Sequence, residues 1–234
     1  MKGQAPKAVV SWSGGKDSCL AAHRAVAAGI RPQALLTAMI ENGTRSRSHG
    51  LRLDLLQAQA RSLGLPLVTR ATSWEDYEET MQAALSLLAG DGVEAGVFGD
   101  IDLEPHREWV AGVCGRAGIE PLHPLWQEPR LALLAELLRL GYEAVVVAIK
   151  DAALPAELLG RRLDRTLVDE LVAHGVDACG EEGEYHTAVL DGPLFRERIR
   201  ARPGARVLRD GYRFLDLVPV PVEEPRPASV YSPA

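Results

Sequence analysis

The sequence is poor in aromatic residues and in cysteine. Aromatic residues make up 5% of its 234 positions, so the core has to be built from Leu, Val, Ala and Ile. The three cysteines, Cys19, Cys114 and Cys179, lie far apart and form no Cys-x-x-Cys pair. This spacing argues against a disulfide framework and against a zinc site.

Long apolar segments and an excess of positive charge are also missing. No apolar run approaches the roughly 20 residues that a membrane-spanning helix requires, and no apolar signal segment stands at the start. We therefore expect a cytoplasmic protein that does not bind membranes. The formal net charge is -6, whereas proteins that bind nucleic acid usually present a basic face. The charge argues against nucleic acid as a partner.

The first half of the chain alternates short apolar runs with helical patterns. This alternation is typical of crossover units and a parallel sheet. We predict an α/β fold: a Rossmann-like parallel sheet of about five strands with flanking helices. The predicted strands are 7–12, 33–39, 65–69, 94–98 and 119–122, and the predicted helices are 18–28, 51–63, 74–89 and 105–117.

The second half is less regular and predicts a smaller C-terminal α+β domain. Pro121, Pro124 and Pro129 bracket a boundary, so we divide the chain into residues 1–125 and 126–222, followed by an extended tail at 223–234. Asp210-Gly211 between two β-rich runs predicts a hairpin. Helices are expected at 131–140 and 163–174, and a strand at 143–149.

The most informative segment is a glycine-containing loop between the first strand and the first helix. Two adjacent glycines let the backbone turn sharply and approach a ligand closely. The unpaired amides and the dipole of the following helix favour an anion. The loop predicts a cradle for phosphates, made of Ser13, Gly14, Gly15, Lys16, Asp17 and Ser18.

This loop is not a Walker A motif or a dinucleotide fingerprint. A Walker A motif has a glycine five positions before Gly15, where Val10 stands, and Ser or Thr after the lysine, where Asp17 stands. The Gly-x-Gly-x-x-Gly pattern of dinucleotide-binding folds is absent. The cradle therefore belongs to another class.

A second polar cluster spans Cys179–Thr187. It places acidic residues, a phenol, an imidazole and a hydroxyl among glycines, ahead of a strand. From the residues alone, a solvated acidic loop and a site for an amine or a metal explain the segment equally well.

Together the two segments resemble a known family. The loop at 13–18 resembles the PP-loop signature of the N-type ATP pyrophosphatases, whose sheet is of the adenine nucleotide alpha hydrolase-like type. The cluster at 179–187, the Gly99-Asp100-Ile101 and Trp126 regions and the run at 190–195 resemble the diphthine-ammonia ligase family. The resemblance covers about Val9 to Phe195. It implies cleavage of ATP to AMP and pyrophosphate and conversion of an activated carboxylate to an amide.

The sequence departs from the family pattern in places. Diphthamide-forming members usually carry Gly-Gly where this chain has Glu182-Gly183, and Glu-Thr where it has His186-Thr187. Residues 105–109 look more like bacterial relatives. Bacteria do not make diphthamide, so in a bacterial protein the acceptor would not be diphthine.

The resemblance implies ATP and Mg2+ as cofactors and a role for each polar residue. Mg2+ would be held by Asp17 and Asp100, because hard cations prefer oxygen ligands. The adenine would rest against the end of the second strand. The expected nucleotide-binding residues are Ser13, Gly14, Gly15, Lys16, Asp17, Ser18, Thr37, Ala38, Met39, His49 and Gly99.

The second segment would form the acceptor site. Its expected residues are Gly180, Glu181, Gly183, Glu184, Tyr185, His186 and Thr187. A carboxylate there could hold an amine and then accept its proton, and the choice between Glu181 and Glu184 stays open. The expected catalytic residues are Lys16, Asp100, Glu181, Glu184 and His186.

The leading functional hypothesis is an ATP-dependent amide ligase that adenylates a carboxylate acceptor and transfers ammonia or an amine. Two alternatives stay open: a tRNA-modifying PP-loop enzyme and a non-catalytic adenine nucleotide sensor. A tRNA-modifying enzyme would need a basic face, and a nucleotide sensor would leave the carboxylates at 181–184 without a function. A homodimer is compatible with the sequence.

Overall fold

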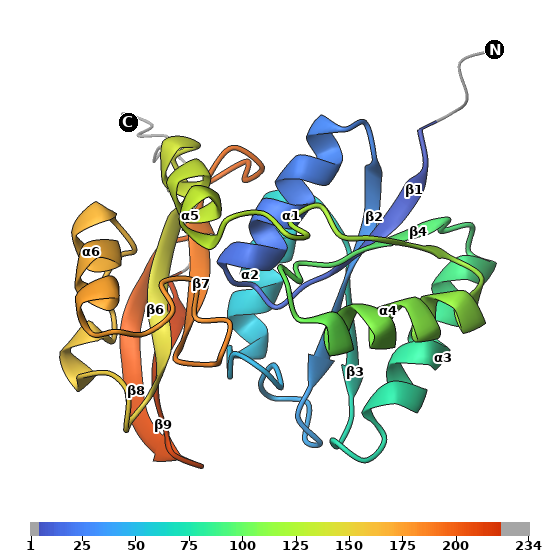
Figure 1. Cartoon of the computed structure of the whole chain (residues 1–234). Coiled ribbons are helices and arrows are strands. Elements are labelled where there is room, and N and C mark those ends of the chain that lie inside the picture. The colour runs from blue at the N-terminus through green and yellow to red at the C-terminus, as the bar shows by residue number, and fades with distance from the viewer. Residues whose placement is uncertain (1–4, 221–234) are drawn as a thin grey trace, which may run out of the picture.

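A computed structural model describes residues 5–220 of the chain, so the extended tail expected at 223–234 lies outside the described residues. The first half forms a five-stranded sheet whose neighbouring strands are all parallel, in the order β3-β2-β1-β4-β5 (Figure 1). The predicted α/β fold is confirmed. The strands are β1 (Lys7–Ser11), β2 (Arg31–Met39), β3 (Leu67–Ala71), β4 (Ala95–Val97) and β5 (Glu120–Leu122).

Two helices cover each face of this sheet. Adjacent residues of a strand point to opposite faces. Val10 packs with residues of α1 (Lys16–Ala27) and α2 (Leu53–Leu63), whereas Val9 packs with residues of α3 (Tyr77–Gly90) and α4 (Glu104–Ala117). All four helices lie within three residues of their predicted starts. The fully buried run Ala8–Val10 is what a central parallel strand requires.

The second half forms a four-stranded antiparallel sheet in the order β7-β6-β9-β8. Asp210 and Gly211 both have positive φ and join the last two strands, which confirms the predicted hairpin. The predicted C-terminal α+β part is thus present. Its elements are α5 (Arg130–Arg139), β6 (Glu143–Lys150), a 3-10 turn (Ala156–Leu158), α6 (Arg165–Ala173), β7 (Tyr185–Asp191), β8 (Ala201–Arg209) and β9 (Tyr212–Pro219).

One apolar core runs through both halves. The cluster that contains Leu20 of α1 and Leu55 of α2 also contains Leu133 of α5 and Val189 of β7. Strand β7 contacts α1, and β9 contacts α2. The second sheet therefore packs directly against the helices that follow β1 and β2. Among residues 5–220 no helix is long and apolar enough to cross a membrane.

The strand order places a crevice beside β1. The chain runs outward from β1 to β3 and then returns to β4 on the other side of β1. In open α/β sheets ligands bind at the carboxyl ends of the strands at such a switch point. The loop at 13–15 follows β1 and Gly99-Asp100 follows β4, so both lie at this edge.

Candidate active site

The loop after β1 has the geometry of an anion cradle. Gly14 adopts a φ of +80°, and Gly15 begins α1 without any side-chain cap. The Ser18 hydroxyl donates to the Gly15 carbonyl at 3.1 Å and lies 3.0 Å from the Ser13 hydroxyl. Within residues 5–220 no protein group accepts a hydrogen bond from the backbone amides of Asp17 and Ser18. These amides are free to bind an anion.

The glycines are required because other segments approach them closely. A Cβ at Gly15 would lie 2.3 Å from Cε1 of His49, and a Cβ at Gly99 would lie 2.9 Å from the backbone of Asp17 and Ser18. Gly99 thus lets β4 come against the start of α1. Any side chain there would displace the helix end that faces the crevice.

Strand β7 clamps the phosphate loop from the second sheet. The Lys16 amide donates to the Thr187 hydroxyl at 3.0 Å, and the Val189 amide donates to the Gly14 carbonyl at 2.9 Å. The buried Gln59 side chain donates to the carbonyls of Gly14 and Val189. The loop is therefore fixed by hydrogen bonds from α2 and β7, not only by its own turn.

The Lys16 side chain is buried and charged. It is 5% exposed, its Nζ lies 2.6 Å from Oδ2 of Asp17, and it stands 5.5 Å above the Tyr185 ring. Burial alone would lower the pKa of Lys16, but the Asp17 carboxylate raises it, and the net pKa lies above its ordinary value. The group remains an ammonium, as binding of phosphate requires.

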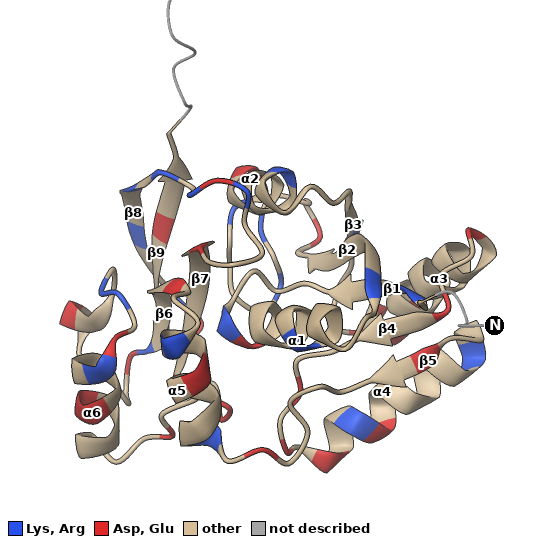
Figure 2. Cartoon of the chain, turned by 90° about the horizontal axis from the view of Figure 1, so that it is seen from above, with Lys and Arg blue, Asp and Glu red and all other residues tan. Residues whose placement is uncertain are grey.

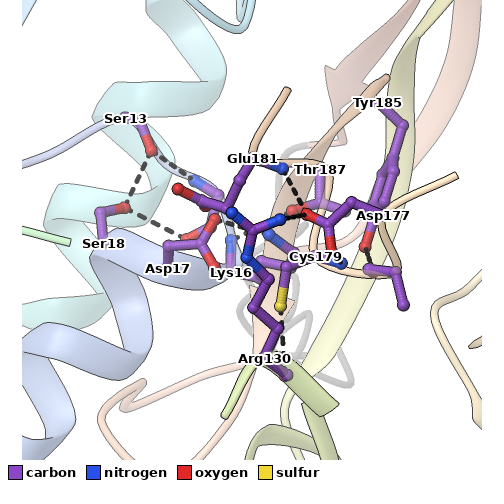
Figure 3. A network of polar contacts seen from close by, with 12 residues as sticks. Ser13, Lys16, Asp17, Ser18, Arg130, Asp177, Cys179, Glu181, Tyr185 and Thr187 are labelled. Carbon is purple, nitrogen blue, oxygen red and sulfur yellow. Dashed lines mark hydrogen bonds and ion pairs between the residues drawn. The ribbon is translucent and has the colours of Figure 1, made fainter. Parts of the chain in front are cut away.

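Glu181 is the carboxylate of the second segment that faces the crevice (Figure 3). Burial, and then the charge of Asp17, raise its pKa to about 7. Its backbone amide donates to Oδ2 of Asp177 at 2.8 Å, which fixes the loop that carries it. A carboxyl group with a pKa near neutrality is suited to exchange protons with a substrate.

Glu184, by contrast, lines neither of the two cavities at this site. Its carboxylate accepts the amides of Asp177 at 3.0 Å and Glu182 at 3.1 Å, and the residue is 8% exposed. The Tyr185 hydroxyl donates to the Ala178 carbonyl at 2.6 Å. Glu184 and Tyr185 therefore brace the loop from inside.

Two cavities meet at this site. The larger, about 490 Å³, opens along the carboxyl edge of the first sheet and is lined by residues such as Ser13, Ser18, Gly99 and Asp100. The smaller, about 150 Å³, is lined by residues that include Lys16, Asp17, His49, Gly180, Glu181, Gly183, Tyr185, His186 and Thr187. Asp17, His49 and Glu181 line both. The phosphate loop and the second segment thus face a common space.

Two neutral imidazoles lie at this junction. The rings of His49 and His186 stack with centroids 4.5 Å apart. Burial lowers the pKa of His49 to about 4 and lowers that of His186 well below its ordinary value. Nδ1 of His49 lies 3.0 Å from the Thr187 carbonyl, so this nitrogen carries the proton. Neither ring adds positive charge near neutral pH.

Asp100 lies in the larger cavity with Asp17. Its carboxylate is 3.4 Å from Nδ1 of His106 and 3.9 Å from Nε2 of His123. Residues 5–220 contain no group of three or more His, Cys, Asp and Glu that could hold a metal by themselves. Mg2+ commonly takes one or two carboxylates together with substrate phosphates. The pair Asp17 and Asp100 fits that pattern.

The structure does not bring Thr37, Ala38 and Met39 into either cavity. The Thr37 hydroxyl donates to the Trp12 carbonyl at 2.6 Å. The carbonyls of Ala38 and Met39 accept the amides of Arg47 and Thr72. These two carbonyls therefore pair with the loops that follow β2 and β3.

Sequence reasoning missed two sets of site residues. Arg130 binds Asp102 at 2.7 Å and Asp177 at 3.1 Å, and so ties the segment after β4 to the loop that carries Glu181. An arginine directly after Pro129 gave no signal of this role. Three aromatic residues, Trp74, Tyr77 and Trp109, line the larger cavity.

Comparisons with known proteins identify the family of the chain. The diphthamide synthase N-terminal domain matches residues 6–121, and the diphthamide synthase C-terminal domain matches residues 129–216. The diphthine–ammonia ligase of Danio rerio is 31% identical over 216 residues, which cover 80% of this chain and 83% of that protein. The enzyme of the same name from Homo sapiens is 31% identical over 212 residues, covering 80% and 79%. The chain belongs to the diphthamide synthase family.

Proposed function

We propose that the protein is an ATP-dependent amide ligase. It adenylates an acceptor carboxylate, releases pyrophosphate, and transfers ammonia or an amine to the activated carbonyl. One observation carries this proposal: the larger cavity, which the phosphate loop lines, and the smaller cavity share Asp17, His49 and Glu181 as lining residues. ATP activation and attack by nitrogen can therefore take place side by side.

The first half-reaction uses the loop at 13–18. The free amides of α1 and the Lys16 ammonium bind the β- and γ-phosphates and stabilise the pyrophosphate as it departs. Asp17 and Asp100 would hold Mg2+, which neutralises phosphate charge when bound. Lys16 is already an ammonium and already in place, so the positive charge requires little rearrangement.

The second half-reaction uses the smaller cavity. A nitrogen nucleophile has to lose a proton when it attacks an acyl adenylate. Glu181, with its pKa near 7, is positioned to accept that proton. His186 lines the same cavity as a neutral ring, and so does not repel a protonated amine.

The acceptor carries a carboxylate, but it need not be diphthine. The relatives are named for diphthine, but this chain places His186 in the cavity wall where diphthamide-forming members usually carry Glu. A change of charge on that wall alters which acceptor or nucleophile fits. We propose a different carboxylate acceptor for this chain.

The two alternatives have less support. Basic and acidic residues alternate along α4, α5 and α6 (Figure 2). The net charge of -6 does not favour RNA binding. A nucleotide sensor has no need of a carboxyl group with a raised pKa beside the phosphate loop.

Product analysis tests the proposal. The protein is incubated with MgATP, ammonium and a panel of carboxylates, and the nucleotide products are separated. We expect AMP and pyrophosphate, formation of both to be lost in Lys16→Ala, and formation of both to be retained in Lys150→Ala, which removes an exposed lysine. ADP and phosphate as products, or undiminished pyrophosphate release by Lys16→Ala, would overturn it.

A further inference from the structure

A strongly basic segment of the chain lies at the edge of the second sheet that is opposite β7 and the phosphate loop. Residues 196–213 contain seven arginines and two acidic residues, a formal charge of +5 in a chain whose total is -6. The segment comprises the end of the connection from β7 to β8, all of β8 and the start of β9 (Figure 2). The rest of the chain is therefore more acidic than the total suggests, and the total hides a local basic surface.

More than half of these arginines have no acidic partner. Three of the seven lie within ion-pair distance of a carboxylate: Arg198, Arg209 and Arg213. The other four are exposed and form no ion pair among residues 5–220: Arg196, Arg200, Arg202 and Arg206. We call these four the basic edge. A guanidinium group presents a planar fork of donors that fits a carboxylate or a phosphate, so the basic edge is suited to an anionic partner.

Strand β8 also has an open backbone. It pairs with β9 on one side, and in the described part of the chain no strand pairs with its other side. Apart from the pairing with β9, residues 205–209 form no backbone hydrogen bond within residues 5–220. The outer side of β8 thus offers amides and carbonyls to an extended chain that lies along it.

The side chains of β8 suit such a chain on both faces of the sheet. Arg202 stands opposite Val218, and Arg206 stands opposite Leu215. Val218 and Leu215 are three residues apart on β9, so they and the arginines opposite them point to different faces. Leu208 shares the face of Arg206 and is 57% exposed. An added strand alternates its side chains between the same two faces, so its acidic groups would meet an arginine on each.

The charge of β8 determines which partner fits. Charged residues at a strand edge prevent copies of the chain from pairing with each other, but they attract a segment of opposite charge. Nucleic acid fits less well, because β8 has no aromatic residue on which a base could stack and phosphates would not cover Leu208. We infer that β8 with its basic edge is a docking site for an extended acidic segment of a partner protein. This inference goes beyond the proposed function and does not depend on it.

Fluorescence anisotropy with two labelled probes tests the inference. One probe is a peptide of glutamate and leucine, and the other is an oligouridylate of equal charge. The peptide should bind more tightly, with an affinity that falls as salt is added. Arg202→Gln combined with Arg206→Gln should raise the Kd of the peptide about fivefold, because two exposed ion pairs are lost. Leu208→Ser should raise it about threefold and should leave the Kd of the oligouridylate unchanged.

Matched controls change exposed residues of the same types on α5 and α6: Arg139→Gln combined with Arg165→Gln, and Leu131→Ser. They should leave the Kd of both probes unchanged. All variants should bind MgATP with the Kd of the wild type, because none of these residues lies at the phosphate loop. Unchanged MgATP binding also shows that the variants fold.

Several results would overturn the inference. These are a wild type that does not bind the peptide, and a double arginine variant that binds it no more weakly than its control. Tighter binding of the oligouridylate than of the peptide would assign the surface to nucleic acid instead. Tighter binding of the peptide after Glu223→Gln combined with Glu224→Gln would assign it to the chain's own C-terminal segment. Failure of the wild type to bind MgATP would remove the proposed function and leave this inference standing.

Discussion

The backbone amide of Lys16 donates a hydrogen bond to the hydroxyl of Thr187, 171 residues further along the chain, at 3.0 Å. This bond joins the phosphate loop of the first sheet to β7, an edge strand of the second sheet. A loop that binds phosphate through backbone groups has to be held in one conformation, and the second sheet supplies that constraint.

Removal of this hydroxyl should loosen the loop. Thr187→Val retains the shape of a 1% exposed side chain but leaves the Lys16 amide without an acceptor. We expect the free energy of unfolding to fall by about 1–3 kcal/mol, the cost of an unsatisfied buried donor, and MgATP to bind more weakly. Urea denaturation and calorimetry measure the two effects. Thr166→Val, the same change at an exposed site of α6, should alter the free energy by less than about 0.5 kcal/mol. Equal behaviour of the two variants would contradict the proposed clamp.

The close approach of His49 to the loop leaves no room for a side chain at Gly15. Gly15 has a φ of -96°, which any residue can adopt, so Gly15→Ala tests contact alone. Its new methyl group would lie 2.3 Å from the His49 ring, and we expect a loss of about 1–3 kcal/mol from overpacking. His49→Ala should recover part of that loss in the double variant. A double-mutant cycle by thermal or urea unfolding gives the coupling, and strictly additive effects would show that the ring does not set the requirement.

Turnover should follow the ionisation of Glu181. Burial, then Asp17, raise its pKa to about 7, and a general base works only as the carboxylate. The rate of amide formation should therefore rise with pH through about 7, and Glu181→Gln should lose turnover while it still binds MgATP. Rates measured from pH 5.5 to 9 test this. A variant that keeps both the rate and its pH dependence would exclude Glu181 as the base.

The raised pKa of Glu181 should also make the stability of the fold depend on pH. The fold disfavours the charged carboxylate, so the folded protein loses stability as the pH rises from the pKa of the unfolded chain, about 4.3, to about 7. Glu181→Gln should therefore be more stable than wild type at pH 8, by roughly 1–3 kcal/mol, and the gain should shrink at pH 5. Denaturation at the two pH values measures it. A variant less stable than wild type at pH 8 would contradict the sign.

Glu184 should behave differently from Glu181. Its two oxygens accept the amides of Asp177 and Glu182. In Glu184→Gln the amide nitrogen replaces one acceptor, so we expect the free energy of unfolding to fall by about 1–3 kcal/mol with only a modest drop in turnover. The pH dependence of the rate should stay that of the wild type. Complete loss of turnover in a stably folded variant would move the role of base to Glu184.

The fold was predictable from local patterns. Apolar runs marked the strands of the parallel sheet because central strands such as β1 are buried on both faces, and Gly64 and Gly118 ended helices in the left-handed conformation that favours glycine. The hairpin at Asp210-Gly211 followed from the turn that those two residues favour. These signals lie within a few residues of the structure that they specify.

The site was predictable only where it is local. The cradle at 13–18 could be predicted because strand, glycines and helix are consecutive. The direction of a side chain within a glycine-rich loop is not local, so the sequence could not distinguish the cavity-facing Glu181 from Glu184, which braces the loop. The pairing of the Ala38 and Met39 carbonyls with Arg47 and Thr72 depends on loops that only the folded chain brings together, and so does the grouping of Trp74, Tyr77 and Trp109 along the larger cavity.

A crystal structure with Mg2+ and a non-cleavable α,β-methylene analogue of ATP would test phosphate binding by the loop after β1 most directly. We predict that phosphate oxygens lie within hydrogen-bond distance of the Lys16 ammonium and of the Asp17 and Ser18 amides, which donate to no protein group among residues 5–220. A triphosphate bound elsewhere, with the loop at 13–18 making no contact, would contradict the assignment.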